Sequence, residues 1–160
     1  TFVGLFSYAK KEKMLEIMKD SRIGTNGTVV LILYFITKIT IISEIITINP
    51  KYLIIFPIIA RLSTSVNAGL SDYARKSGMS NAIISENGIF EVIFSLILTN
   101  ALVFLIIGTK GGIALFIALL FIVLFMFNVR KKIGGITGDT MGASLELTSI
   151  LVLFLGIILR

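Results

Sequence analysis

The amino-acid sequence predicts an all-α integral membrane protein, a polytopic bundle of about five transmembrane helices preceded by a short amphipathic helix. Of its 160 residues, 56% are hydrophobic and 15% are charged, whereas soluble proteins average ~25% charged residues. A soluble domain of this size cannot bury so much apolar surface, and a disordered chain is poor in Ile, Leu, Val and Phe. A lipid bilayer suits this composition, and we expect residues 1–160 to form a single membrane domain.

The chain has no cysteine and no histidine, which excludes several kinds of site. A disulfide scaffold, a Ser-His-Asp triad and a His-ligated zinc site are all ruled out within it. Its chemistry must therefore use carboxylates, hydroxyls, amides, Lys and Arg. The net charge is +6, which we interpret as a signal of membrane orientation and not of nucleic-acid binding.

Residues 8–21 are predicted to form an amphipathic helix at the membrane surface. Apolar side chains line one stripe of this segment, and acidic side chains recur every four residues. The stripe comprises Met14, Leu15, Ile17 and Met18, and the acidic residues are Glu12, Glu16 and Asp20. An interfacial helix with a solvated charged face is the simplest interpretation. No signal peptide is predicted, because this long charged segment precedes the first apolar run.

Five stretches approach the length of about 20 mostly apolar residues that a membrane-spanning helix needs. The predicted spans are residues 28–48, 52–68, 89–108, 112–129 and 141–159. Ionisable side chains inside a span are costly, so each of them needs a partner or a function. Those inside the predicted spans are Lys38, Glu44, Arg61, Glu91 and Glu146.

Arg61 follows Pro57, which loosens the helix around it. Arg61 has three candidate partners, namely Glu44, Glu91 and a phosphate group at the functional face of the protein. Lys38 is expected to snorkel toward the membrane surface if its span ends early.

The distribution of Lys and Arg orients the five spans. Ten of these residues fall before the first span, between the second and third, and between the fourth and fifth, whereas three fall on the opposite side. Basic residues are enriched in cytoplasmic loops, so the first group of segments is predicted to be cytoplasmic.

The loop between the second and third spans contains Arg75 and Lys76, flanked by Gly69 and Gly78. Two interpretations stay open for this loop. It is either a connector with ordinary cytoplasmic charges or a phosphate clamp that uses the two cations.

The segment before the last span is rich in glycine and contains Asp139, seven residues before Glu146. This spacing places both carboxylates on one face of a helix with Gly142 between them, where they suit a hard cation such as Mg²⁺. A glycine-rich turn at a helix N-terminus binds phosphate through backbone N–H groups, and Thr137 or Asp139 is expected to cap the helix. Small-residue helix packing is the alternative, but it does not explain a carboxylate inside an apolar run.

Three stretches carry motifs of a known family. They are GLFSYAKKEKMLEIMKDSRIGTNG at residues 4–27, PIIARLSTSVNAGLSDYARKSGMSNA at residues 57–82, and GGITGDTMGASLEL at residues 134–147. Together they resemble the cobalamin synthase family, the integral membrane adenosylcobinamide-GDP ribazoletransferases. The resemblance extends over essentially the whole chain, and its most specific parts are the MKDSRIG and GGxTGDxxGAxxE motifs.

The resemblance implies a Mg²⁺-dependent transferase that joins α-ribazole, or its 5′-phosphate, to adenosylcobinamide-GDP and releases GMP. This is the final step of nucleotide-loop assembly in cobalamin biosynthesis. With this reaction in view, the candidate catalytic residues are Asp20, Arg22 and Asp139. The candidate metal ligands are Asp20, Asp139 and Glu146. The candidate phosphate-binding residues are Arg61, Arg75, Lys76, Gly135, Thr137 and Gly138.

The chain also departs from the family pattern. Family members are longer and begin with further membrane segments and an acidic motif similar to DGxxDTxDG. Val3 stands at an acidic position of that motif, and Ser149 stands where many members carry a second acid after Glu146. We therefore expect the chain to correspond to the C-terminal part of a family member, and to insert and fold without transferase activity of its own.

The resemblance further implies a multi-pass protein of the cell inner membrane with its active face in the cytoplasm. Its expected partners are the two substrates and the bilayer, with other corrinoid-pathway enzymes and a second copy of the chain as candidates. Two other functions are consistent with the residues alone. One is a small-solute transporter with intramembrane charges along its path, and the other is a non-catalytic membrane assembly subunit.

Overall fold

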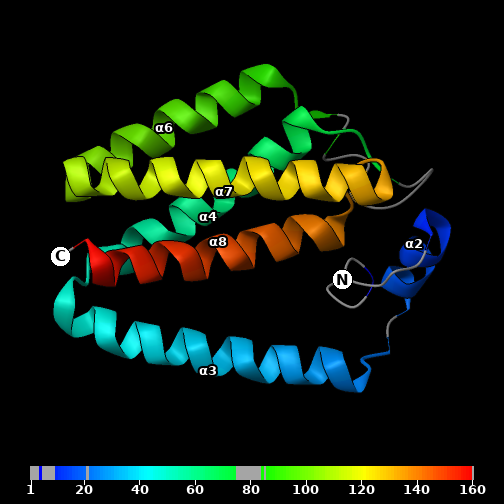
Figure 1. The fold of residues 1–160 in the computed structure, drawn as a ribbon. Helices are drawn as coiled ribbons and strands as arrows, with labels where there is room; N and C mark the ends of the chain where they lie inside the picture. The colour runs from blue at the N-terminus through cyan, green and yellow to red at the C-terminus, as the bar shows by residue number, and fades with distance from the viewer. Residues whose placement is uncertain (1–3, 5–9, 21, 75–83, 85, 160) are drawn as a thin grey trace.

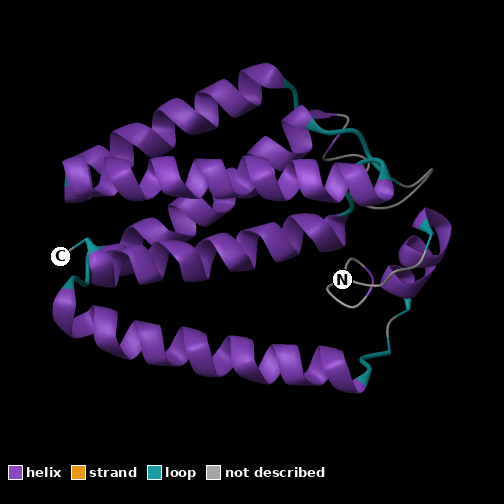
Figure 2. Cartoon of the chain, in the orientation of Figure 1, coloured by secondary structure: helices purple, strands orange, loops and turns teal. Residues whose placement is uncertain are grey.

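The computed structural model describes residues 4, 10–20, 22–74, 84 and 86–159, which form a helical bundle (Figure 1). Its main helices are α2 (Lys11–Lys19), α3 (Thr25–Ile48), α4 (Tyr52–Leu70), α6 (Ile89–Ile107), α7 (Thr109–Ile133) and α8 (Gly138–Ile158). Figure 2 shows no strand among the described residues, whose one β-type pairing is an isolated bridge between Tyr73 and Ile136. All these helices except α2 are long and apolar enough to cross a membrane, which confirms the predicted fold class.

Several helices extend beyond the apolar runs that predict them. α3 begins at Thr25 instead of residue 28, and α7 continues to Ile133, where Gly134 adopts a φ of +76° and ends the helix. α8 begins at Gly138 because Thr137 caps it. α2 is shorter than the expected residues 8–21 and covers Lys11–Lys19.

α8 is the central helix of the bundle, and its most extensive contact is with α4. Near the C-terminal end of α8, a Cβ atom on Gly156 would lie 2.6 Å from Cγ of Tyr52 and 2.8 Å from Cδ1 of Ile45. Both of these side chains are fully buried. Glycine at position 156 therefore lets α3, α4 and α8 converge at this end of the bundle.

A buried amide joins α4 to α8 closer to the other end. The Asn67 side-chain nitrogen lies 2.6 Å from the Ser63 carbonyl oxygen and 3.0 Å from Oγ of Ser144. Asn67 and Ser144 are both buried. Polar contacts of this kind stabilise helix pairs in membranes, so this one fixes the part of α8 that lies between Asp139 and Glu146.

α3 stands partly apart from the other helices. Its buried residues, Ile41 and Ile45, both lie in its second half. Figure 1 shows α3 diverging from α8 toward the end of the bundle where α2 lies. The first half of α3 therefore leaves space beside the N-terminal half of α8.

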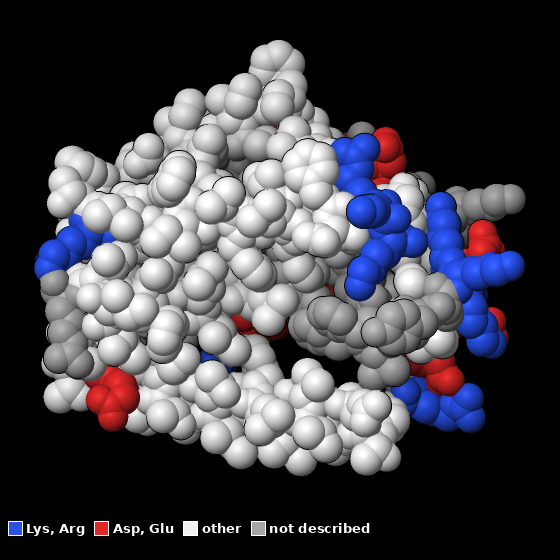
Figure 3. Space-filling view, in the orientation of Figure 1, with Lys and Arg blue, Asp and Glu red and all other residues white. Residues whose placement is uncertain are grey.

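α2 packs on that same end of the bundle. Met14 and Met18 of α2 join a buried apolar cluster with Val129 and Ile133 of α7 and with Met141 of α8. Most of the Lys and Arg side chains visible in Figure 3 gather at this end. The arrangement agrees with the uneven distribution of basic residues along the sequence, and the cytoplasmic assignment of this end stays a prediction.

Two loops meet beside α2. The Ala74 N–H donates to the Ile136 carbonyl and the Ile136 N–H donates to the Asp72 carbonyl, each at 2.8 Å. A Cβ atom on Gly135 would lie only 2.5 Å from the Asp72 carbonyl oxygen. Gly135 therefore allows the two loop backbones to approach each other, which is a structural role different from the phosphate contact expected of it.

Candidate functional site

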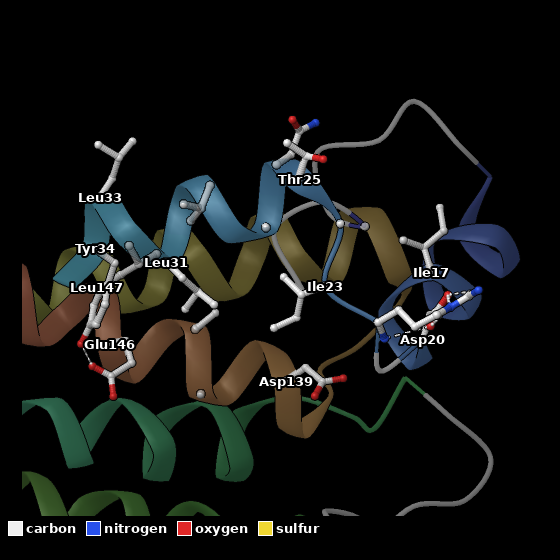
Figure 4. A pocket seen from close by; sticks show the side chains of 18 of the residues that line it. Ile17, Asp20, Ile23, Thr25, Leu31, Leu33, Tyr34, Asp139, Glu146 and Leu147 are labelled. Atoms are coloured by element: carbon white, nitrogen blue, oxygen red, sulfur yellow. Dashed lines mark hydrogen bonds and ion pairs between the residues drawn. The ribbon is translucent and has the colours of Figure 1, made fainter. Parts of the chain in front are cut away.

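A pocket of about 1030 Å³ lies between the first half of α3, the N-terminal half of α8 and the chain that follows α2 (Figure 4). Four of the candidate site residues line it: Asp20, Arg22, Asp139 and Glu146. The divergence of α3 from α8 creates this pocket, so the fold brings together two motifs that are more than a hundred residues apart in the sequence.

Asp20 and Arg22 form an ion pair at the mouth of the pocket. The Arg22 Nη2 atom lies 2.8 Å from Asp20 Oδ2, and Arg22 Nε lies 3.1 and 3.2 Å from the two carboxylate oxygens. Hydrogen bonds from the Arg22 side chain and backbone lower the pKa of Asp20 to about 2. Asp20 is therefore ionised at neutral pH, and it hydrogen-bonds the exposed Arg22 guanidinium, whose planar N–H groups suit a phosphate group.

α8 presents one continuous face to the pocket. Asp139, Gly142, Ala143 and Glu146 all line it, as their spacing along a helix requires. A Cβ atom on Gly142 would meet no other atom within 4 Å. The glycine between the two carboxylates thus faces open space, and helix packing does not account for it.

Thr137 fixes the start of this face. Its Oγ1 accepts a hydrogen bond from the Thr140 N–H at 3.3 Å, and the Thr137 N–H donates to Oγ1 of Thr140 at 2.9 Å. The capping residue is therefore Thr137 and not Asp139, and the buried Thr137 hydroxyl serves the helix. The cap places Gly138 and Asp139 in the first turn of α8, where the helix dipole favours negative charge.

At the inner end of the pocket, Glu146 contacts two side chains of α3. Its Oε2 atom lies 2.8 Å from the Lys38 ammonium and accepts a hydrogen bond from the Tyr34 hydroxyl. The Lys38 ammonium also lies 2.6 Å from the Tyr34 hydroxyl and 5.8 Å from the centre of the Phe56 ring. We call Tyr34, Lys38 and Glu146 the inner polar cluster.

The inner polar cluster differs from what the sequence predicts for Lys38. The first span does not end early, because α3 continues to Ile48, and Lys38 pairs with Glu146 instead of snorkelling. Tyr34 was missed altogether. Its position four residues before Lys38 is the available signal, since residues at that spacing are neighbours on a helix.

The remaining candidates lie elsewhere. Arg61 is exposed on α4 and does not line the pocket. In the described part of the chain it forms no ion pair with Glu44 or Glu91, and Glu91 instead accepts a hydrogen bond from the Gly88 N–H at 2.8 Å.

Arg75, Lys76 and Val3 lie outside the described residues. Ser149 is buried and donates to the Leu145 carbonyl at 3.0 Å.

Binding of Mg²⁺ by the carboxylates of the pocket stays a prediction. The described residues contain no group of three or more acidic side chains placed to hold a metal ion by themselves. Mg²⁺ is commonly bound by one or two carboxylates together with substrate phosphates. Asp20 and Asp139, which line the same pocket, have the right donor atoms for such a shared site.

Comparison with known proteins places the sequence of this chain in a family. The sequence model of the cobalamin-5-phosphate synthase family (CobS) matches residues 1–157. The chain is 37% identical to the adenosylcobinamide-GDP ribazoletransferase of Fusobacterium nucleatum, with 99% of this chain and 66% of the relative covered. It is 40% identical to the enzyme of the same name from Clostridium acetobutylicum, with 92% of this chain and 59% of the relative covered.

No solved structure matches the chain. The chain spans somewhat less than two thirds of the length of the curated relatives it matches. Because the family model covers nearly every residue, the chain belongs to the cobalamin-5-phosphate synthase family.

Proposed function

We propose that the protein containing this chain joins α-ribazole, or its 5′-phosphate, to adenosylcobinamide-GDP and releases GMP. The observation that carries the proposal is that Asp20, Arg22, Asp139 and Glu146 line one pocket. The two motifs that supply these residues are the most specific parts of the family resemblance, and the named relatives are adenosylcobinamide-GDP ribazoletransferases.

In this reaction a ribose hydroxyl of α-ribazole attacks the phosphorus atom that is linked to the corrinoid. A new P–O bond forms to the ribose oxygen, the P–O bond to GMP breaks, and the hydroxyl proton is released. Phosphoryl transfer of this type depends mainly on positioning and on charge neutralisation. The pocket offers both without histidine.

Each residue at the mouth has a separate task in this proposal. Arg22 binds a pyrophosphate oxygen, and Asp20 keeps its guanidinium oriented. Asp139 accepts the proton of the attacking hydroxyl, and the N-terminus of α8 attracts the pyrophosphate. Asp139 and Asp20 are the residues that would hold a Mg²⁺ ion here, which would supply additional neutralisation of charge.

The transporter alternative depends on a path lined by intramembrane charges. Arg61, Glu44 and Glu91 do not line the pocket, and Glu91 caps the first turn of α6. These positions favour the transferase. We further propose that the pocket mouth faces the cytoplasm, supported by the basic residues at that end of the bundle. A second copy of the chain and other corrinoid-pathway enzymes stay predicted partners.

The test is release of GMP from adenosylcobinamide-GDP, by the protein as it is encoded, in lipid nanodiscs. Release should require α-ribazole and Mg²⁺, and Asp139→Asn should lower it at least a hundredfold while leaving the unfolding midpoint in SDS within error of the wild type. The matched control is Glu44→Gln on the exposed side of α3. Absence of ribazole-dependent GMP release, or full turnover by Asp139→Asn, would contradict the proposal.

A further inference from the structure

The pocket is polar at both ends and apolar between them. Asp20, Arg22 and Asp139 line its mouth, and Tyr34 and Glu146 line its inner end. Between them lie apolar side chains, among which are Leu31 of α3 (Figure 4) and Ala143 of α8. Asp139 and Glu146 are seven residues apart on one helix, so the two polar ends are separated by about 10 Å along α8.

This pattern limits the chemistry of the ligand. A lipid acyl chain has one polar end and would bring its methyl terminus against Glu146 and Lys38, at a cost in desolvation. The α-ribazole base has methyl groups at the end remote from its ribose, so these methyl groups would also lie against the polar side chains of Glu146 and Lys38. A ligand with a charged group at one end, a flat middle and hydrogen-bonding atoms at the other end suits the pocket.

The inner polar cluster indicates which hydrogen-bonding atoms are expected. Tyr34 and Lys38 both contact Oε2 of Glu146. A carboxylate has about four acceptor sites, so further sites on Glu146 are available to a ligand; its side chain is 47% exposed. A carboxylate accepts two adjacent N–H groups well, and the Tyr34 hydroxyl beside it has one proton, which it donates to Glu146 in the absence of a ligand.

We propose that the inner polar cluster binds the guanine base of a guanosine diphosphate group. When guanine binds, the Tyr34 O–H turns from Oε2 of Glu146 to the guanine O6, which frees an acceptor site on Oε2. The N1–H and N2–H groups of guanine then donate to the two oxygens of the Glu146 carboxylate. Lys38 hydrogen-bonds both the Glu146 carboxylate and the Tyr34 hydroxyl. The base lies against Leu31 and Ala143, and the phosphates reach Arg22 at the mouth.

The space in the pocket is consistent with this ligand. Its volume of about 1030 Å³ is just above the usual range for small-molecule sites, ~300–1,000 Å³. Gly142 adds no side chain between the two polar ends of the α8 face. This inference rests on the proposed function, and it gives Glu146 the role of a specificity-determining residue in place of the metal ligand that the sequence suggests.

The experiment measures binding of GMP, IMP and AMP to the protein as encoded, in nanodiscs, by isothermal titration calorimetry. GMP should bind at least tenfold more tightly than IMP, which lacks the N2 amino group, and more tightly than AMP. Glu146→Gln should weaken GMP binding by about 10- to 100-fold, the usual effect of losing hydrogen bonds to a charged group. IMP binding should fall less, and Glu44→Gln should change neither.

A second pair of variants tests the apolar middle without altering the cluster. Leu31→Trp fills the space beside α8 and should abolish GMP binding, whereas Ile32→Trp, on the next residue and outside the pocket lining, should leave it intact. Equal binding of GMP, IMP and AMP would overturn the guanine assignment. So would an unchanged GMP affinity in Glu146→Gln together with a raised KM for α-ribazole. Ribazole-dependent turnover would persist in either case and leave the proposed function standing.

Discussion

Substitutions of Gly142 distinguish two effects of a larger side chain, namely loss of space for a ligand in the pocket and disturbance of helix packing. A Cβ atom at this position meets no atom within 4 Å, although Gly142 lies inside α8. Glycine inside a helix costs about 1 kcal/mol relative to alanine. Gly142→Ala should therefore raise the free energy of unfolding by up to about 1 kcal/mol. Gly156→Ala, on the same helix, should lower it by about 1–3 kcal/mol, because the new Cβ lies 2.6 Å from Cγ of Tyr52.

A larger side chain at position 142 should affect activity without affecting folding. Gly142→Leu extends four carbon atoms into the pocket between Asp139 and Glu146. We expect ribazole-dependent GMP release to fall at least tenfold, which corresponds to about 1.4 kcal/mol of transition-state stabilisation. The free energy of unfolding, measured by SDS titration of the protein in mixed micelles, should stay at or above the wild-type value.

Two results would refute this reasoning. Wild-type GMP release by Gly142→Leu would show that the pocket between α3 and α8 is not used by a substrate. A lower free energy of unfolding in Gly142→Ala would show that position 142 packs against another part of the protein. Gly156→Ala is the internal control, since it must lower stability if the SDS titration reports helix packing.

Three further predictions concern the buried amide, the mouth of the pocket and the topology. Asn67→Leu should lower the free energy of unfolding in SDS by about 1–2 kcal/mol, because it leaves Ser144 without its amide donor; an unchanged value would exclude a stabilising role for this contact. Arg22→Leu should return the pKa of Asp20 from about 2 toward its ordinary 3.8, as followed by carboxyl ¹³C NMR. Because the folded pKa is the lower one, the stability contributed by this pair is present above pH 3.8 and is lost as the pH falls toward 2. Finally, Lys131→Cys should react with a membrane-impermeant maleimide only from the cytoplasmic side, and Lys110→Cys only from the opposite side. Labelling of both variants from the same side would contradict the five-span topology.

The sequence predicts the five spans well, because a membrane helix requires a long apolar run and such runs are visible directly. It also predicts that Asp139 and Glu146 share a face, since helical spacing is a local property. The partners of the intramembrane charges are a different matter. Lys38 meets Glu146 only because α3 and α8 lie side by side, and no local pattern specifies which helices are neighbours.

The same reason explains the residues that sequence reasoning placed differently. The sequence predicts Arg61 among the phosphate ligands, but Arg61 of α4 does not line the pocket. Gly135 was expected to approach a ligand, and it approaches the backbone of Asp72 instead. The residue type indicates the energetic cost of a charge inside a span, for Arg61, or the conformational freedom of the backbone, for Gly135. The tertiary arrangement decides which neighbours each residue contacts.

The Lys38–Glu146 pair allows a last prediction that distinguishes stability from function. Both side chains are partly shielded, with 22% and 47% of their surfaces exposed. Lys38→Met leaves the Glu146 carboxylate without its cation inside a span, and should lower the free energy of unfolding by about 1–2 kcal/mol. The double variant with Glu146→Leu removes both charges and should return to near the wild-type value, because an apolar pair of similar size often replaces an ion pair without loss.

The double variant should nevertheless lose GMP affinity as fully as Glu146→Gln does. A cluster kept only to hold α3 against α8 would show the opposite pattern, with GMP affinity following stability through the whole series. SDS titration and calorimetry on the wild type, Lys38→Met and the double variant therefore separate the two roles. Additive losses of stability in the double variant would contradict the view that the carboxylate and the ammonium compensate each other. Recovery of stability without recovery of binding indicates that the charges are present for the ligand.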